Sequence, residues 1–380
     1  MSGIYIHVPF CRKACHYCNF HFSTSANYAD AMVLALKKEI ELRKHEVKLP
    51  IETIYFGGGT PSILSAIQVE VLIKQVTSCF DVIQTPEITF EVNPDDLSKN
   101  YIKAIYNLGV NRLSIGIQSF SDKELVLMNR AHNSKQAIQA VLWAKEVFNN
   151  ISIDLLYGTP HTTFVDWQQN LTTALSLDVS HISSYALTLE PKTALEHFVK
   201  KGVVSLLDEQ DVEEQFLHLR NILITSGYEH YELSSFGKPG YHSKNNTAYW
   251  KGKSYLGIGP SAHGYNGNSR YWNVSNNAQY MKRINEKQLP QTIEKLSVVD
   301  KFNEAIMIGL RASWGVSLPQ MEQGLGIRYR RYLETQAQRY VNEGLLSIEE
   351  ECLKTTPKGM FLADGIAAEL FLIDFLDTSL

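Results

Sequence analysis

The sequence predicts an α/β fold, an incomplete (β/α)6 barrel of the TIM type followed by a smaller, mainly helical C-terminal domain. Six short apolar or β-branched runs recur in the first half of the chain, at residues 4–10, 53–61, 87–94, 112–120, 151–160 and 181–191. Such runs, closed by Gly, Pro or a polar residue and separated by helical stretches, are typical of buried parallel strands with helical crossovers. A doubly wound sheet is the alternative.

The stretches between these strands carry helical patterns. Residues 30–44 place apolar side chains on one side of a helix, at Met32, Leu34, Leu36, Ile40 and Leu42. Residues 134–148 predict another helix with Ser134 as its N-cap, and Gly109 is expected to end the helix before the fourth strand.

Polar residues follow the predicted strands at their C-terminal ends. The cysteines come after the first strand, residues 57–60 after the second, Glu91 after the third and Gln118 after the fourth, and Asp154 lies in the fifth. Sites of α/β barrels are built at this rim, which favours a barrel over a doubly wound sheet. Six units are too few for a closed eightfold barrel.

The pattern changes after residue 191. Residues 208–226 read as helix, 228–277 as a loop rich in Gly, Ser, Asn and Tyr, and the chain from residue 300 as mainly helical. A short β-like segment and a final helix are expected at the end. We therefore expect a barrel domain with its extension over residues 1–285, with a core at 1–195, and a C-terminal domain over 295–380.

Composition and charge are those of an ordinary globular protein. The 36 Lys and Arg residues against 40 Asp and Glu give a net charge of −4, which offers no global reason to bind nucleic acid. No apolar run reaches the roughly 20 residues that a membrane-spanning helix needs, and a basic-then-apolar signal peptide is absent. A cytoplasmic protein is the expectation.

Three of the five cysteines, Cys11, Cys15 and Cys18, lie in the segment CRKACHYCNF. In a reducing compartment such a cluster indicates metal binding or redox chemistry, whereas Cys79 and Cys352 are expected to be small buried hydrophobes. A zinc site needs a fourth ligand, for which His7, His16 and His21 are candidates. The alternative is an iron–sulfur cluster with one iron left open to a small molecule.

The spacing C-x3-C-x2-C, with Tyr17 before the last cysteine, resembles the signature of the radical S-adenosylmethionine (SAM) superfamily, and GGGTP at 57–61 resembles its glycine-rich motif. The resemblance implies a [4Fe–4S] cluster whose open iron is chelated by SAM, and one-electron cleavage of SAM. Backbone amides at the glycines are expected to approach the methionine carboxylate. An external electron donor such as flavodoxin or ferredoxin would be required.

The segments IYIHVPFC, GGGTPS, EVNP, SIGIQSF, DLLYGTP and GIGPSAH extend the resemblance over nearly the whole chain, to the coproporphyrinogen-dehydrogenase-like branch of that superfamily. By this resemblance the cluster ligands are Cys11, Cys15 and Cys18. The positions implied to contact SAM are Tyr5, Tyr17, Gly58, Gly59, Thr60, Glu91, Gln118, Arg130, Asp154 and Ala186. No residue is assigned to catalysis.

Two departures separate the members of this branch. The oxygen-independent coproporphyrinogen dehydrogenases carry a further cysteine where this chain has Phe20, and an N-terminal extension that we do not expect here. Both features resemble instead the heme-chaperone members, which bind heme and deliver it. Dehydrogenase activity, the oxidative decarboxylation of coproporphyrinogen III, stays the alternative, and a zinc-stabilised binding barrel is a third hypothesis.

The heme-chaperone members carry an H-N-x-x-Y motif, which SKNNTAYW at 243–250 matches with Asn245 in place of the histidine. Asn is a poor iron ligand beside His. The tentative heme residues are His242, Asn246 and Tyr249, with His263 as another candidate. The expected partners are heme and a heme-acceptor protein, with membrane contact only through that acceptor.

Overall fold

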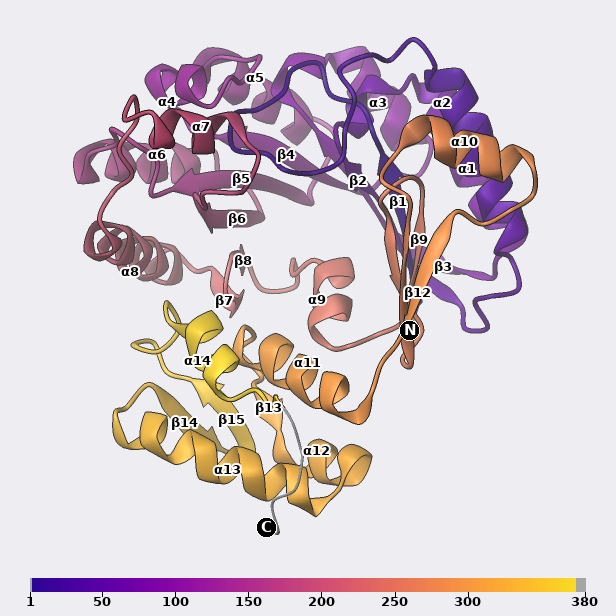
Figure 1. The fold of residues 1–380 in the computed structure, drawn as a ribbon. Coiled ribbons are helices and arrows are strands. Elements are labelled where there is room, and N and C mark those ends of the chain that lie inside the picture. Colours follow the sequence, from indigo (N-terminus) through magenta and orange to yellow (C-terminus); the bar gives the residue numbers. More distant parts are fainter. Residues whose placement is uncertain (1, 374–380) are drawn as a thin grey trace.

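The computed structural model describes residues 2–373; residues 374–380 of the expected C-terminal domain lie outside the described part. Six parallel strands form the wall of the barrel: β1 (Ser2–Val8), β2 (Ile51–Gly58), β3 (Val82–Val92), β4 (Arg112–Gln118), β5 (Ile151–Tyr157) and β6 (His181–Ala186). Helices cover their outer side (Figure 1): α1 (Ala29–Leu42), α2 (Ala66–Cys79), α3 (Lys99–Asn107), α4 (Asp122–Leu127), α5 (Ser134–Lys145) and α6 (Phe164–Ser176). The expected incomplete (β/α)6 barrel is confirmed.

The strands divide their side chains between two environments, as β4 illustrates. Leu113, Ile115 and Ile117 are 0% exposed and pack in the main core beneath the outer helices. Arg112 and Ser114 alternate with them and face the opposite, concave side. The outer face of the wall is therefore apolar, and the inner face is polar.

The expected loop at 228–277 is wrong. It contains β7 (Glu229–Glu232), β8 (Ser235–Gly237), α9 (Lys244–Trp250), β9 (Tyr255–Ile258), β10 (His263–Tyr265) and β11 (Ser269–Asn273). Together with β12 (Gln291–Lys295), these strands extend the barrel wall at both edges into one 12-stranded sheet, ordered β12-β11-β10-β9-β1-β2-β3-β4-β5-β6-β8-β7. The sheet does not close on itself.

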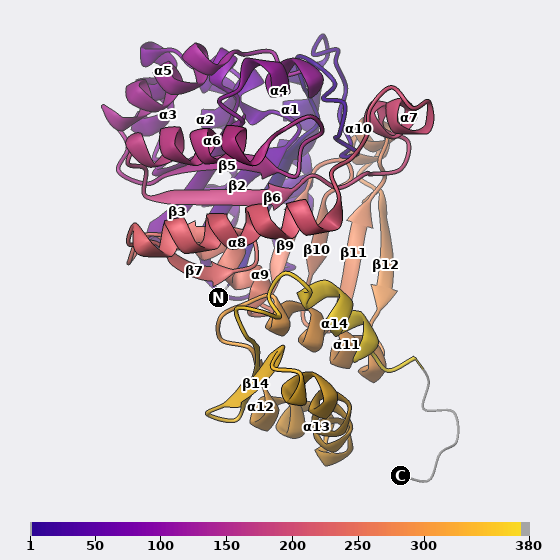
Figure 2. The same ribbon diagram turned by 90° about the vertical axis from the view of Figure 1, so that its left-hand side faces the viewer.

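The extension depends on pairing with the edges of the barrel. Strand β9 runs parallel to β1, with Gly3 opposite Tyr255, and β8 runs antiparallel to β6. Three helices accompany these strands (Figure 2): α7 (Ala194–Lys200), α8 (Glu209–Thr225) and α10 (Asn277–Asn285). Backbone hydrogen bonds to an existing edge hold short strands whose side chains carry little apolar pattern.

The C-terminal region has its own core. Helices α11 (Val298–Leu310), α12 (Leu318–Leu325), α13 (Ile327–Asn342) and α14 (Ala363–Glu369) pack around a small sheet of β13 (Val316–Ser317), β14 (Leu346–Glu349) and β15 (Cys352–Thr355). The buried side chains of this second core include Phe302, Leu333 and Leu353. The helix-rich tail with a β-hairpin, expected from the sequence, is confirmed.

Several local expectations are corrected. Asn133, not Ser134, caps α5, because its side chain accepts from the Gln136 amide in a capping box. Leu34 lies on the solvent side of α1 and is 64% exposed. Cys79 and Cys352 are both only partly buried.

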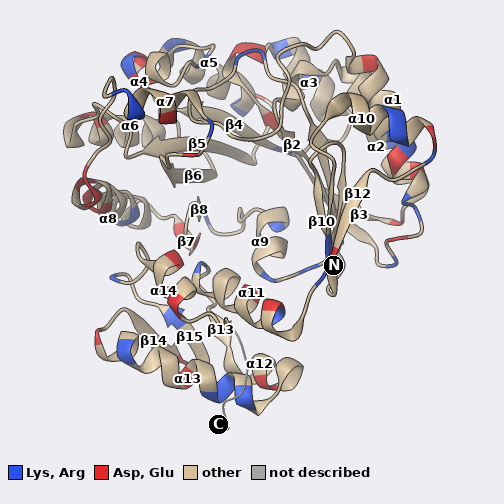
Figure 3. Cartoon of the chain, viewed as in Figure 1, with Lys and Arg blue, Asp and Glu red and all other residues tan. Residues whose placement is uncertain are grey.

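Gly109 ends α3 as expected, with a φ of +97°. Within residues 2–373, no helix is long and apolar enough to span a bilayer. Figure 3 shows basic and acidic residues interspersed over the outer helices.

Candidate functional site

The three cysteines lie on the long connection between β1 and α1, which other segments hold in place. The Cys11 amide donates to Ser23 O at 3.0 Å, and the His16 amide donates to Met128 O at 3.1 Å. Asn129 Nδ2 donates to Ala14 O at 2.8 Å. The first bond closes the loop on itself, and the other two fasten it to the segment after α4, at the end of the barrel where the parallel strands terminate.

A chain of hydrogen bonds joins two of the thiols. Thr60 Oγ1 donates to Cys11 Sγ at 3.5 Å and accepts from Asn93 Nδ2 at 3.1 Å. Asn93 Oδ1 accepts from Arg130 Nη2 at 2.7 Å, and Arg130 Nη1 donates to Cys15 Sγ at 3.3 Å. The loop, the ends of β2 and β3, and the segment after α4 therefore form one network around the cysteines.

The thiols are close enough to influence one another electrostatically. Burial raises the pKa of Cys11 to about 12, with smaller contributions from Cys18 and Cys15, while the Thr60 hydroxyl and the Arg130 guanidinium act in the opposite direction. Burial also raises the pKa of Cys18. Iron would displace these protons on binding, because the thiolate is the ligand.

The donor set fits an iron–sulfur cluster better than a single ion. Among the described residues, no three His, Cys, Asp or Glu side chains converge closely enough to hold one metal ion. In a cluster the thiolates bind different irons, so convergence on one point is not required.

Each histidine that a zinc site could use makes a contact within the protein through one of its ring nitrogens. His16 Nδ1 contacts Leu127 O at 2.7 Å, His7 Nε2 contacts His21 O at 2.9 Å, and His21 Nε2 contacts Asn277 Oδ1 at 2.7 Å. These contacts leave the other ring nitrogen of each histidine available, so what counts against the zinc alternative is that no three such ligands converge among the described residues.

The glycine-rich segment after β2 is packed against β1. A Cβ on Gly59 would lie 2.5 Å from Phe10 O, and a Cβ on Gly58 would lie 2.5 Å from the His7 ring. The Gly59 amide donates to Val8 O at 2.9 Å, and the Gly58 amide interacts with the Glu91 carboxylate. In this structure these two amides make contacts within the protein, and their approach to a ligand carboxylate stays a prediction.

Two carboxylates occupy the concave face below the cysteine loop. Tyr55 Oη donates to Glu91 at 2.7 Å, and Ser114 Oγ lies 3.4 Å from both oxygens of Asp154. Burial raises the pKa of Glu91 to about 7 and that of Asp154 to about 6. Both groups can accept hydrogen bonds from a ligand, and each is only partly covered.

The other predicted SAM positions lie at the same end of the barrel or on its inner face. Gln118 has a φ of 72° at a register shift between β4 and β5, so it leaves the regular strand path. Tyr17 packs against the small cluster of Leu125, Met128 and Leu156. Ala186 ends β6, and Tyr5 on β1 stacks with Tyr55, their ring centroids 6.0 Å apart.

The tentative heme residues lie on the connection between β8 and β9, away from the cysteine loop. His242 Nε2 is 2.8 Å from Glu229 Oε2, and its ring stacks on Tyr231 at 4.1 Å. Asn245 is 2% exposed and accepts from Thr53 Oγ1 at 3.0 Å, near the start of β2.

Helix α9 carries the remaining tentative residues. Asn246 lies in its first turn, where its amide donates to Ser243 Oγ. Burial at the inner face raises the pKa of Tyr249; the side chain of Asn245 opposes this rise and the nearby Glu91 carboxylate adds to it. His263, the other candidate, is on β10 and stacks with Trp272.

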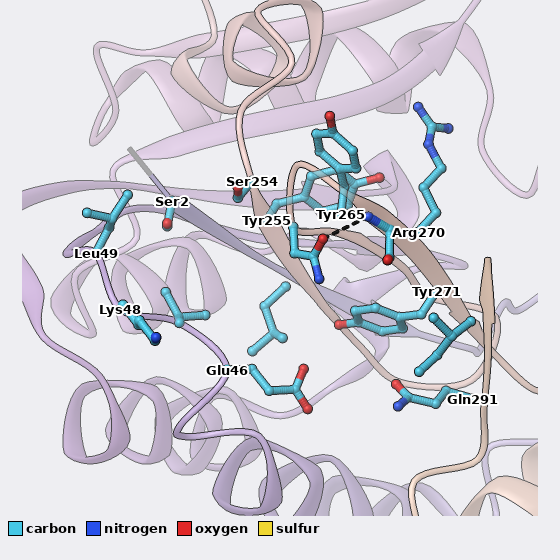
Figure 4. Close-up of a pocket in the computed structure, with 15 residues that line it drawn as sticks. Ser2, Glu46, Lys48, Leu49, Ser254, Tyr255, Tyr265, Arg270, Tyr271 and Gln291 are labelled. Carbon is cyan, nitrogen blue, oxygen red and sulfur yellow. Dashed lines mark hydrogen bonds between the residues drawn. The ribbon is translucent and has the colours of Figure 1, made fainter. Parts of the chain in front are cut away.

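A pocket of about 550 Å³ lies between the α1–β2 connection and strands β9–β12 (Figure 4). Glu46, Lys48, Tyr265 and Arg270 are among its lining residues. It contains none of the cysteines and none of the predicted SAM positions, so it is separate from the site described above.

The fold and the cysteine loop define a class of protein. The family model described as "Radical SAM superfamily" matches residues 5–173, and the model described as "HemN C-terminal domain" matches residues 296–362. Coproporphyrinogen III oxidase (HemN) from Escherichia coli, a radical SAM enzyme, has a similar structure, with a TM-score of 0.83 at 23% identity over 97% of this chain and 90% of that one.

Curated relatives narrow the class. Heme chaperone HemW from Lactococcus lactis is 34% identical over 98% of both chains. The Bacillus subtilis heme chaperone HemW is 33% identical over 96% of this chain and 98% of its own. The chain therefore belongs to the HemW family within the radical SAM superfamily.

Sequence reasoning missed two polar residues of this region. Asn93 lies in the EVNP segment and links the partners of Cys11 and Cys15. Arg112 opens β4 and is 1% exposed on the concave face. The available signal was a polar residue at the end of a strand for Asn93, and a charge at an inward position of an otherwise apolar strand for Arg112.

Proposed function

We propose that this chain holds a [4Fe–4S] cluster on Cys11, Cys15 and Cys18, binds SAM beside it, and acts as a heme-binding chaperone that passes heme to an acceptor protein. The single observation that carries the cluster site is the hydrogen-bond network that runs from Cys11 through Thr60, Asn93 and Arg130 to Cys15. The heme function is supported by the HemW relatives, which match this chain over nearly its whole length.

The residues have distinct parts in this proposal. The thiolates would ligate iron, and the Arg130 guanidinium would stabilise the charge on Cys15. Glu91 and Asp154 would accept hydrogen bonds from the ammonium or ribose groups of SAM, and Gln118 can donate or accept. When bound, the cluster and SAM together supply one-electron cleavage of the sulfonium, with electrons from a flavodoxin- or ferredoxin-type donor.

Anaerobic reconstitution tests the cluster site. Wild-type protein should take up iron and acid-labile sulfide and give an EPR spectrum that changes when SAM is added. Cys15→Ser should lose the cluster, whereas Cys79→Ser, a change at a cysteine outside the loop, should keep it. Zinc without sulfide in the wild-type protein would refute the proposal.

The alternative activity is the SAM-dependent decarboxylation of coproporphyrinogen III to protoporphyrinogen IX. The HemN structure shows a shared fold only, and Phe20 stands 69% exposed where the dehydrogenases are expected to carry a further cysteine. An anaerobic assay with coproporphyrinogen III, SAM and a reductant decides between the two functions. Turnover would defeat the chaperone proposal.

Heme titration tests the tentative ligands. His242 contacts Glu229, and Asn245 is buried against Thr53, so neither is presented to a ligand without rearrangement. If His242→Ala and Asn245→His both leave the Soret band unchanged, neither His242 nor position 245 supplies the iron ligand. We also infer a division into units at 1–285 and 295–380, supported by the second core and the HemN C-terminal match.

A further inference from the structure

Two arginines, Arg43 and Arg112, are fully enclosed at 0% and 1% exposed, but their surroundings differ. Arg43 bonds to Glu39 at 2.8 Å and to Glu46 at 3.0 Å, and it contacts Asn273 and Gln291 as well. Within residues 2–373 no ion pair or side-chain hydrogen bond holds the Arg112 guanidinium, and its Nε has no partner. An enclosed charge without a partner is unfavourable, so this arrangement calls for an explanation.

A second unsatisfied group lies beside Arg112. Thr89 on β3 is its register partner across the sheet, and Thr89 Oγ1 is buried without a hydrogen-bond partner. Both side chains point to the concave face, because Ser114, two residues after Arg112 on β4, faces Asp154 there. A cationic and a hydroxyl donor are thus presented together to the interior of the barrel.

Solvent reaches this interior. Glu91, Asp154, Tyr5 and Tyr55 all face it and are only partly covered, although the outward residues of the same strands are buried. The Arg112 charge lowers the pKa of Glu91 and of Asp154, a smaller influence than the burial that raises both, yet neither carboxylate pairs with it directly. The concave face is therefore partly open at these four side chains, on the side of the sheet toward which Arg112 points.

We propose that Arg112, with Thr89 beside it, binds a carboxylate of a tetrapyrrole, a propionate group, inside the barrel. A guanidinium matches a carboxylate in a bidentate geometry. The inference rests on the proposed function, because the heme-chaperone assignment is what supplies a tetrapyrrole. It adds a residue that binds the propionate of the tetrapyrrole, a role that none of the tentative heme residues has.

The position along β4 distinguishes two sources of carboxylate. Arg112 begins the strand, and Gly116, whose carbonyl accepts from Arg130 at 2.5 Å, lies four residues farther on. At about 3.3 Å per residue the two are roughly 13 Å apart along the strand. The methionine carboxylate of SAM belongs beside the cluster at the Gly116 end, whereas a tetrapyrrole with its propionates is large enough to reach Arg112.

Heme and heme dimethyl ester, in which both propionates are esterified, provide the test. Full-length wild-type protein should bind heme about tenfold or more tightly than the ester, as judged by Soret titration, since a charge-assisted hydrogen bond has that effect on binding. Arg112→Met should reduce the preference to about twofold or less, and Arg112→Lys should retain part of it. SAM binding to the reconstituted variants should stay within about twofold of wild type.

Thermal unfolding of the same proteins separates recognition from folding. Arg112→Met should keep or raise the midpoint because it removes an unpaired enclosed charge, whereas Arg43→Met should lower it because it leaves Glu39 without its partner.

The inference is overturned if Arg112→Met prefers heme over its ester as strongly as the wild-type protein does. It is also overturned if Arg112→Met weakens the binding of SAM alone. A wild-type protein that binds heme and its ester equally also overturns it, without touching the chaperone proposal. A wild-type protein that binds neither refutes the chaperone proposal itself.

Discussion

Replacing Asn93 with alanine removes the link between the partners of two predicted cluster ligands. Asn93 accepts from Arg130 at 2.7 Å and donates to Thr60 at 3.1 Å. A hydrogen bond to a charged group contributes about 1.5–3 kcal/mol and a neutral one about 0.5–1.5 kcal/mol, so the two together give about 2–4.5 kcal/mol. We expect a lower free energy of unfolding by about this amount in the cluster-free protein, less any compensation by water.

The same change should weaken the cluster. Outer partners that orient metal ligands typically affect metal affinity 10–100-fold, and here Arg130 and Thr60 each contact a cysteine sulfur. We expect Asn93→Ala to assemble less iron and sulfide per chain and to release iron faster to a chelator. Asn93→Asp keeps the acceptor for Arg130 and should retain more cluster than the alanine variant.

Asn111→Ala is the matched control. Asn111 also makes two bonds through its side chain, from the Ile88 amide at 2.9 Å and to Pro86 O at 2.7 Å, but it contacts neither a cysteine nor a cysteine's partner. It should lower stability without changing the rate of iron release relative to wild type. Equal iron release from Asn93→Ala and Asn111→Ala would refute the reasoning.

Three further changes test the site and its surroundings. Burial raises the pKa of Glu91 to about 7. Between about pH 4.5 and 7 the folded chain therefore keeps a proton that the unfolded chain has released. The free energy of unfolding consequently falls as pH rises through this range, by up to about 3 kcal/mol. Glu91→Gln should flatten that part of the stability profile measured by urea titration, and a slope equal to wild type would contradict the assignment. Gly59→Ala should lower the free energy of unfolding by about 1–3 kcal/mol, because the new Cβ would lie 2.5 Å from Phe10 O. Gly324→Ala is the control: its Cβ would have no atom within 4 Å, so the free energy of unfolding should be unchanged or higher. Asn245→His should lower the midpoint of thermal unfolding by crowding the Thr53 contact; an unchanged midpoint would show that the site accommodates an imidazole.

The barrel was predictable from sequence because its signals are local. Each of β1–β6 is a short apolar run that ends in Gly, Pro or a polar residue, and burial on the outer face demands such runs. Strands β7–β11 gave no such signal, because segments such as HYE in β7 or HGY in β10 are stabilised by pairing with the neighbouring strands β8, β9 and β11 rather than by an apolar pattern of their own.

The site was predictable only in part, for a similar reason. The cysteine spacing is a local feature of ten residues, but Asn93 acts through Thr60 and Arg130, which are 33 and 37 positions away along the chain. The charge of Arg112 in an apolar strand was visible in the sequence, but its lack of a partner at Nε became visible only in the folded structure. The glycine motif was recognised from the sequence, but its packing against Phe10 and His7 is tertiary and could not be predicted.

The parallel pairing of β9 with β1 has a consequence for how the chain is made. Strand β1 is synthesised first, yet its second neighbour arrives only with Tyr255, some 250 residues later. Until then one edge of β1, the strand that leads into the cysteine loop, has unpaired backbone groups and is open to misassociation. A ribosome-bound chain that ends before β9 would therefore carry the cysteine loop next to a strand with one unpaired edge, and that edge is covered only once β9 has been made.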